Sequence, residues 1–256
     1  MRNTLTIAGK EIQSYFVQPV AYVVMTVFLL LGGWFFFALV SRFNSAMQMY
    51  SATQNQAAGR MNLNQWVAEP LLHNLAIVLV ILIPAVTMRT FAEEKRTGTY
   101  ELLLTAPLRT AEIVVGKFIG SSVFVLIMIA LAGIFPLILT FFGNPETGVM
   151  LSGYLGLSCL AVSFVSVGMF TSSVTDSQII AAISCFGALL LMYVISWPAE
   201  AGGGVFTGLL RYLSLPEHFG QMVRGLIDTQ DLVYFASLIF VALFLTQRSV
   251  ESARWR

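Results

Sequence analysis

Six uncharged apolar runs constrain this chain more than any other feature of its sequence. Each is about 15 to 25 residues long, and they cover approximately residues 20–40, 71–88, 118–142, 151–174, 179–197 and 232–246. A helix that crosses the ~30 Å hydrocarbon core of a bilayer needs roughly 20 apolar residues. Only helices and closed barrels satisfy their backbone polar groups in lipid, and these runs do not alternate with period two. The sequence therefore predicts an all-α membrane protein with six transmembrane helices.

Composition and missing motifs exclude several classes of protein. Of the 256 residues, 57% are hydrophobic and 11% are charged, whereas soluble proteins carry about 25% charged residues. No Asp, Glu, Lys or Arg lies in the central part of a run, which argues against a proton-driven transporter because such transporters use ionisable groups inside the membrane. The phosphate-binding motif GxxxxGK[ST] does not occur. We therefore expect a membrane protein that is not an enzyme and receives its energy from another subunit.

The basic residues between the runs predict the orientation in the membrane. With the N-terminus in the cytoplasm, ten of the fourteen Lys and Arg residues fall in cytoplasmic segments and four fall outside. Cytoplasmic loops carry the excess of Lys and Arg in membrane proteins. Residues 1–19 are polar and contain no early apolar segment, so we expect no cleaved signal peptide. The sequence predicts a multi-pass protein with both termini in the cytoplasm.

Three segments that flank the runs have a character of their own. Residues 4–18 place apolar and polar side chains on different helical faces, which predicts an amphipathic helix on the cytoplasmic interface before Pro19. Residues 41–70 are polar, which favours a mobile loop outside the membrane. Residues 198–231 are too apolar for a solvated loop and too interrupted by Gly and Pro for a span, so we expect short helices that dip into the outer face, with Asp228 capping the last helix. The apolar face of the first segment comprises Leu5, Ala8, Ile12 and Tyr15, opposite Lys10, Ser14 and Gln18.

A charged island at residues 89–117 separates the second and third runs and must lie in water. It holds five of the fourteen basic residues and four of the thirteen acids. We expect the helix of the second run to continue to Lys95 and to end at Gly98. Thr99 then caps a short helix, which carries the leucines at 102–104 until Pro107 interrupts it, and Thr110 caps the next helix. The island is predicted to form a helix–turn–helix elbow with a leucine-rich tip.

Two interpretations of this elbow differ in function. One is an ordinary solvated loop that joins two spans. However, such a loop has no need of three consecutive leucines between Glu101 and Thr105. A compact apolar patch with charges at its rim is typical of a protein interface. The pattern favours a docking surface for a cytoplasmic subunit.

The island also carries a family resemblance. The run FAEEKRTGTYELLLTAPLRTAEIVVGK resembles the signature of type-2 ABC transporter permeases, in which an acidic–basic cluster precedes Gly-Thr, then Glu-Leu-Leu, then a Pro at the start of a helix. The segments KEIQSYFVQPVAYVV and LSLPEHFGQMVRGLIDTQDLVYF agree with this, and together they resemble the gliding-motility-associated branch of that family. The matching residues here are Glu93, Glu94, Lys95 and Arg96, then Gly98 and Thr99, then Glu101, Leu102 and Leu103, then Pro107.

This resemblance implies a fold and a function. The fold is one domain over residues 1–256, with an N-terminal elbow helix at 1–19, a cytoplasmic coupling helix within 89–117 and re-entrant helices within 198–231. The function is that of an ABC-2 permease subunit in the bacterial inner membrane, which pairs with a second permease and contacts lipid but not nucleic acid. ATP and Mg²⁺ are expected in separate ATPase subunits, and no cofactor in this chain. The residues implied in coupling are Glu93, Glu94, Arg96, Gly98, Thr99, Glu101, Leu102, Leu103, Pro107 and Arg109.

Other candidate sites give weaker signals. His73 and His218 have no set of additional ligands at metal-binding spacing, so we expect interfacial packing or solvent exposure rather than a metal site. The serines and threonines at 163–173 either line a path or bond backbone carbonyls. Gly116 and Gly120 form a small-xxx-small pair, which is a common spacing in membrane helices.

Two other functional classes were weighed. An intramembrane protease needs a serine nucleophile and a histidine base within the spans, and His73 lies at a helix end with no serine marked by a motif. A membrane scaffold that recruits a cytoplasmic partner without transport remains the alternative to a permease. We expect no catalytic residue in this chain.

Overall fold

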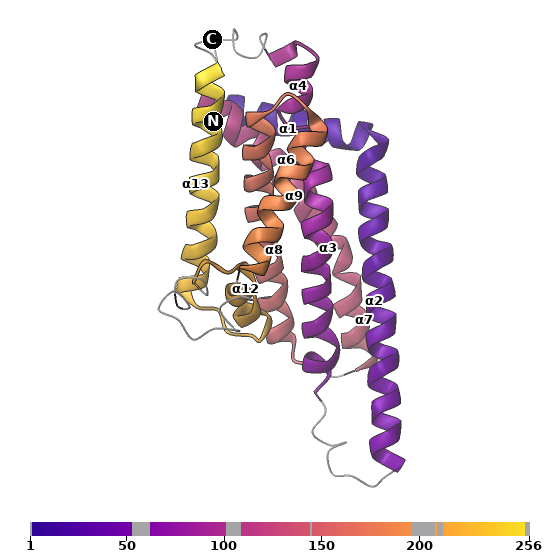
Figure 1. The fold of residues 1–256 in the computed structure, drawn as a ribbon. Helices are drawn as coiled ribbons and strands as arrows, with labels where there is room; N and C mark the ends of the chain where they lie inside the picture. Colours follow the sequence, from indigo (N-terminus) through magenta and orange to yellow (C-terminus); the bar gives the residue numbers. More distant parts are fainter. Residues whose placement is uncertain are drawn as a thin grey trace.

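The computed structural model describes residues 2–52, 62–100, 109–143, 145–195, 208 and 212–253, and this part of the chain contains helices and no strand. The helices run mostly side by side as a bundle (Figure 1). In chain order they are α1 (Arg2–Val17), α2 (Pro19–Ala52), the π-helix η2 (Asn64–Ala68), α3 (Glu69–Thr87), α4 (Ala92–Arg96), α6 (Thr110–Ala132), α7 (Ile134–Phe142), α8 (Thr147–Val174), α9 (Gln178–Val194), α12 (Leu215–Val223) and α13 (Thr229–Ala253).

The two ends of the bundle carry different elements. Helix α1 lies across the end at which both chain termini are found, and α4 lies at the same end (Figure 1). Helix α12 lies at the opposite end, and α2 projects beyond its neighbours there (Figure 1). The charged island and the predicted outer segment are therefore separated by the length of the bundle.

Five helical stretches are long and apolar enough to cross a membrane. They are Pro19–Ala52, Asn64–Arg96, Thr110–Phe142, Thr147–Val174 and Thr229–Ser252. The remaining predicted span, the fifth along the chain, corresponds to α9, an apolar helix of 17 residues that extends about 25 Å at 1.5 Å per residue. The structure thus supports a multi-pass all-helical protein with five spanning candidates and a shorter apolar helix beside them.

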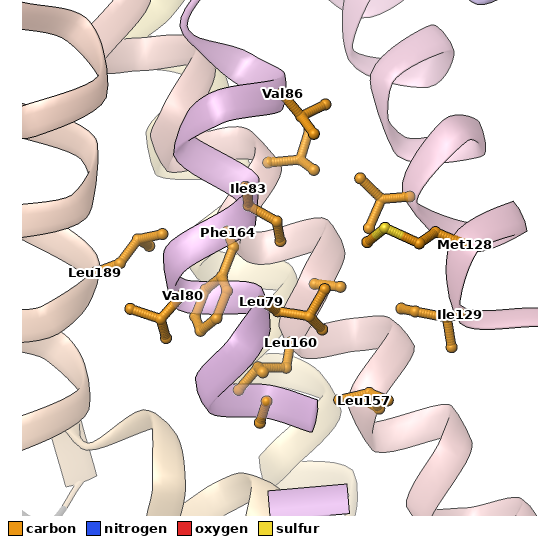
Figure 2. Packing of buried hydrophobic residues seen from close by; sticks show 14 of the residues in the cluster. Leu79, Val80, Ile83, Val86, Met128, Ile129, Leu157, Leu160, Phe164 and Leu189 are labelled. Carbon is orange, nitrogen blue, oxygen red and sulfur yellow. The ribbon is translucent and has the colours of Figure 1, made fainter. Parts of the chain in front are cut away.

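The core is centred on α3, which packs between α8, α2 and α9. Leu79, Val80, Ile83 and Val86 of α3 point toward the neighbouring helices (Figure 2) and are at most 5% exposed. Around them lie Leu157, Leu160 and Phe164 of α8, Met128 and Ile129 of α6, and Leu189 of α9. Glycines on α8 let its neighbours approach closely, since a Cβ at Gly168 would collide with the side chain of Thr87.

The described helices correct the predicted loop at residues 41–70. Helix α2 continues to Ala52, η2 covers Asn64–Ala68, and α3 begins at Glu69. Ala, Met and Gln all favour helices, so the helix persists after its side chains become polar. The apolar run ends near Val40, whereas the helix continues to Ala52.

The third run is divided at Gly133 into α6 and α7. Pro136 lacks an N–H group and cannot bond the carbonyl of Ala132 four residues earlier. The hydroxyl of Tyr154 on α8 donates to that carbonyl instead, at 2.9 Å. A neighbouring helix thus satisfies the backbone group that the proline leaves free.

The segment 198–231 contains one well-defined helix among its described residues. Helix α12 buries Leu215, Phe219, Met222 and Val223 against the bundle. As predicted, Asp228 caps the following helix, because its Oδ1 accepts from the backbone N–H of Gln230 at 3.3 Å. Residues 198–207 and 209–211 lie outside the described part.

Candidate functional site

The turn between α3 and α4 is held by a serine from a distant helix. Ser172 of α8 is fully buried, and its Oγ accepts from the backbone N–H groups of Phe91 and Ala92, both at 3.1 Å. The same hydroxyl donates to the carbonyl of Met88 at 3.0 Å. A helix of five residues has few internal bonds for its first N–H groups, and Ser172 takes the role of a capping residue. This corrects the predicted continuous helix to Lys95: α3 ends at Thr87, and α4 is a separate helix fastened to the end of α8.

A buried lysine joins α4 to α1 and α6. The side chain of Lys117 on α6 is 5% exposed, and its Nζ lies 2.8 Å from Glu94 Oε1 and 3.3 Å from Glu11 Oε2. Nζ also donates to the carbonyl of Thr90 at 2.8 Å. All three donors of the ammonium group are therefore used within the protein. The expectation that the whole island lies in water is wrong at Lys117, because two carboxylates and a carbonyl replace its water.

Close helix contact brings Glu11 to Lys117. A Cβ at Gly116 would lie 2.8 Å from Cβ of Ile7, and one at Gly120 would lie 2.6 Å from Cβ of Glu11. Glycines on α6 therefore let α1 lie directly on its surface. The α1–α6 contact is the most extensive in the described part of the chain.

The packed face of α1 differs in part from the predicted apolar face. Ala8 and Tyr15 are buried as expected, and the Tyr15 ring stacks on Phe124 with 4.8 Å between centroids. The Tyr15 hydroxyl lies 3.1 Å from Ser121 Oγ. Leu5, in contrast, is 68% exposed, because the side that faces α6 is set by the glycines of α6 and includes Glu11.

A second lysine ties α4 to the end of α8 and to the turn that follows it. Lys95 Nζ donates to the carbonyl of Ser173 at 2.7 Å and lies 3.5 Å from Asp176 Oδ1, between α8 and α9. The hydroxyl of Ser249 on α13 donates to the same Ser173 carbonyl at 3.0 Å. Nζ also lies 5.6 Å from the centroid of the Tyr100 ring. Helix α4 is thus anchored to the end of α8 through Ala92 and Lys95, and to Lys117 of α6 through Glu94.

A polar cavity of about 240 Å³ lies beside this junction. Burial raises the pKa of the Glu11 carboxyl, the charge of Glu94 raises it further, and Lys117 opposes both. Burial also raises the pKa of Tyr100 to about 12, helped by the charges of Glu94 and Asp176. The charges largely neutralise one another, so the arrangement is suited to holding helices together. The lining side chains include Glu11, Tyr15, Gln18, Arg89, Glu93, Glu94, Thr97 and Lys117.

Comparison with known protein families decides the class of this chain. Residues 5–246 match the family described as ABC-2 family transporter protein. The chain belongs to the ABC-2 transporter family. No curated protein matches it.

Six of the ten predicted coupling residues of this ABC-2 family protein lie in the described part of the chain. Glu93 and Glu94 are half-buried in α4, whereas Arg96, Gly98, Thr99 and Arg109 are exposed. Gly98 ends the α4 turn in the left-handed region, with φ +72°. Glu101, Leu102, Leu103 and Pro107 lie outside the described residues.

The helix that follows the elbow begins one residue earlier than predicted. Arg109, and not Thr110, is the capping residue of α6. Glu112 Oε2 accepts from the Arg109 backbone N–H at 3.2 Å, and Thr110 is the first helical residue and is buried. Glu112 lies in the first turn of α6.

Sequence reasoning about this ABC-2 family protein missed four residues of the junction at which α4 meets α1, α6 and α8. Lys95 and Lys117 were counted only as charges of the island, Ser172 only as a span serine, and Glu11 was not assigned to a face. Glu11 and Lys117 are 106 positions apart, so no local pattern connects them. The Gly116–Gly120 pair was the available signal, since it marks a helix surface that another helix can approach.

The structure distinguishes the two interpretations that the sequence left open for His218, packing and solvent exposure. His218 is 5% exposed, so packing is confirmed for it and solvent exposure is wrong. Within the described part of this ABC-2 family protein, no three His, Cys, Asp or Glu side chains are grouped so that they could hold a metal ion.

Proposed function

We propose that this chain is the permease subunit of an ABC-2 transporter, which forms the membrane pathway and couples to separate ATPase subunits. The proposal treats residues 1–256 as one membrane domain with six spans, of which α9 is the fifth. We also place it in the gliding-motility-associated branch, on the strength of the three quoted segments. The partners are two ATPase subunits that bind ATP and Mg²⁺, a second permease subunit and membrane lipid.

The observation that carries the proposal is the anchoring of α4. In the sequence, α4 precedes the leucine-rich tip. Its residues are bonded to α6 through Lys117, which also holds Glu11 of α1, to α8 through Ser172, and to Asp176 between α8 and α9 through Lys95. A force applied to the tip would reach these helices together, as rigid-body transitions between inward- and outward-facing states require. A loop that merely joined two spans would not need buried charges at its base.

Purification of the complex from native membranes tests the function. The permease is expected to carry an ATPase subunit with it, in a particle with two copies of each. In proteoliposomes, this ATPase is expected to turn over at a rate that depends on the permease and its transported substrate. Isolation without any ATPase would contradict the proposal. An ATPase that binds but ignores every candidate substrate would indicate the scaffold instead.

The orientation is tested by cysteine labelling. In a chain with Cys159→Ala and Cys185→Ala, a membrane-impermeant maleimide is expected to label Gln48→Cys in intact spheroplasts but not Thr97→Cys. Both side chains are exposed and lie toward opposite ends of the bundle, and the prediction follows from the excess of basic residues on the Thr97 side. Permeabilised cells should label both positions. The reverse pattern in intact spheroplasts would overturn the proposed orientation.

A further inference from the structure

A buried histidine and a buried aspartate meet at the end of the bundle opposite the termini. His218 of α12 and Asp231 of α13 are 5% and 2% exposed, and the His218 Nδ1 atom lies 2.7 Å from Asp231 Oδ1. The other ring nitrogen, Nε2, lies 2.9 Å from the carbonyl oxygen of Tyr212. The ring of Tyr234 stacks on the imidazole with 4.1 Å between centroids.

These partners fix the number of protons that the pair must hold. A carbonyl oxygen only accepts, so Nε2 must carry a proton and donate it to Tyr212. The 2.7 Å contact on the other side needs a second proton between Nδ1 and Oδ1, either as imidazolium with carboxylate or as neutral imidazole with carboxylic acid. Both forms contain the same proton count and no net charge. Asp231 Oδ2 is buried and has no hydrogen-bond partner in the described part of the chain.

The proton therefore has a structural consequence. If it leaves, a buried carboxylate faces the lone pair of Nδ1 with no cation beside it, which is a costly arrangement in a low-dielectric site. If a further proton is added at low pH, a buried imidazolium is left without its carboxylate. Either change weakens the polar contact between α12 and α13.

Helix α12 packs mainly on α8 and meets α13 at this contact. Its apolar residues pack on α8, whose Ser152 hydroxyl donates to the carbonyl of Met222 at 2.7 Å. A Cβ at Gly156 would lie 2.8 Å from Cβ of Met222. The Tyr234 hydroxyl donates to the carbonyl of Leu213 at 2.8 Å. If the contact between His218 and Asp231 is lost, α12 is still held by α8 but is no longer bonded to α13 at this point.

Several other titratable groups surround α12. Glu217 and Arg224 lie on α12 itself, and Arg224 Nε is 3.3 Å from Glu69 Oε1 of α3. His73 of α3 contacts the ring of Phe219 edge-on, 5.3 Å between centroids. Asp228 precedes α13, and Tyr193 lies in the last turn of α9. Among the described residues that face His218, Asp231 is the acid that touches its ring.

We propose that His218 and Asp231 form a buried proton-binding site that fastens α12 across the end of the bundle, so that proton loss loosens this helix. In the orientation proposed above, this end faces the extracytoplasmic side, and the pH outside the cell would act on it. The site does not depend on the ATPase.

Hydrogen exchange of α12 tests the consequence. After correction for intrinsic exchange rates, protection of the peptide that covers residues 215–223 is expected to fall roughly tenfold or more as the pH is raised from about 6 to about 9. Asp231→Asn removes the shared proton, but the asparagine amide can still donate to Nδ1 of a neutral His218. In this variant, the protection of residues 215–223 is therefore expected to stay level over this pH range. His73→Gln, a change at the neighbouring histidine, should retain the wild-type dependence.

Nitrogen NMR of the ring tests the proton directly. The chain has two histidines, so ¹⁵N-histidine in His73→Gln gives the signals of His218 alone. At neutral pH, we expect Nε2 to be protonated and Nδ1 to share or carry a proton. A bare Nδ1 at neutral pH would overturn the proposal, as would wild-type exchange that is level with pH or an Asp231→Asn profile like that of wild type. If Asp231→Asn does not fold, the ¹⁵N spectrum of His73→Gln and the exchange profile of the wild type still test the proposal.

Discussion

Leu103→Asp is expected to abolish co-purification of the ATPase while the permease still inserts into the membrane and dimerises. Leu103 belongs to the leucine-rich tip between Glu101 and Pro107, which we propose to seat in a groove of the ATPase. Burial of a leucine is worth roughly 1.5–3 kcal/mol, and a carboxylate in the same place adds a desolvation cost. The amount of bound ATPase should therefore fall at least about tenfold.

A matched variant separates this effect from that of charge alone. Ser252→Asp introduces the same carboxylate at an exposed position on α13, at the same end of the bundle but outside the elbow. It should retain the ATPase at the wild-type yield. Membrane insertion and cross-linked dimer are measured for both variants. If Leu103→Asp keeps its ATPase, the segment is a connecting loop, and the proposed docking surface is wrong.

Lys117→Met is expected to destabilise the end of the bundle that carries α1 and α4 more than any other single change at the junction. The substitution keeps most of the side-chain volume but leaves Glu11 and Glu94 close together with no cation between them. Loss of one partner from a buried ion pair costs about 3–5 kcal/mol. The melting temperature in detergent should fall by on the order of 10 °C, and α1 should become sensitive to protease.

Two further variants test the cause. Lys95→Met removes a lysine whose acidic partner Asp176 is 79% exposed, so its loss should be much smaller. The triple change Glu11→Gln, Lys117→Met and Glu94→Gln removes all three charges and should recover most of the stability lost in Lys117→Met. Equal melting temperatures for Lys117→Met and Lys95→Met would contradict the prediction, because the buried cluster would then stabilise the protein no more than the exposed Lys95–Asp176 pair does.

The spans were predictable because one physical constraint dictates them. Helix α8 ends at Val174, where the fourth apolar run ends, and the charged island coincides with the turn, α4 and the start of α6. A charge in hydrocarbon is costly, so the pattern of charges reveals the boundaries without knowledge of neighbours. The helix ends were less predictable, as the continuation of α2 to Ala52 shows.

The candidate site was predictable only in the part that is local in sequence. Gly98 after a charged helical turn indicated an end to that helix, and it has a positive φ there. The partners of α4 were not predictable in this way. Ser172 lies 80 positions from Ala92, and a serine in a membrane helix bonds its own backbone as readily as that of another helix.

The sequence by itself determined the membrane class, the location of the long apolar helices and the position of the charged segment between the second and third runs. Only the tertiary structure decided which face of each helix is packed, and so which charges meet. The reason is that lipid is as apolar as a protein core: in α2, Phe28 is fully buried while Phe37 is 75% exposed, and hydropathy does not tell them apart. The rotation of α1 on the glycines of α6 brings Glu11 to Lys117, and the packing of α12 brings His218 to Asp231. Such contacts depend on the shapes of two helix surfaces together, which no single stretch of sequence contains.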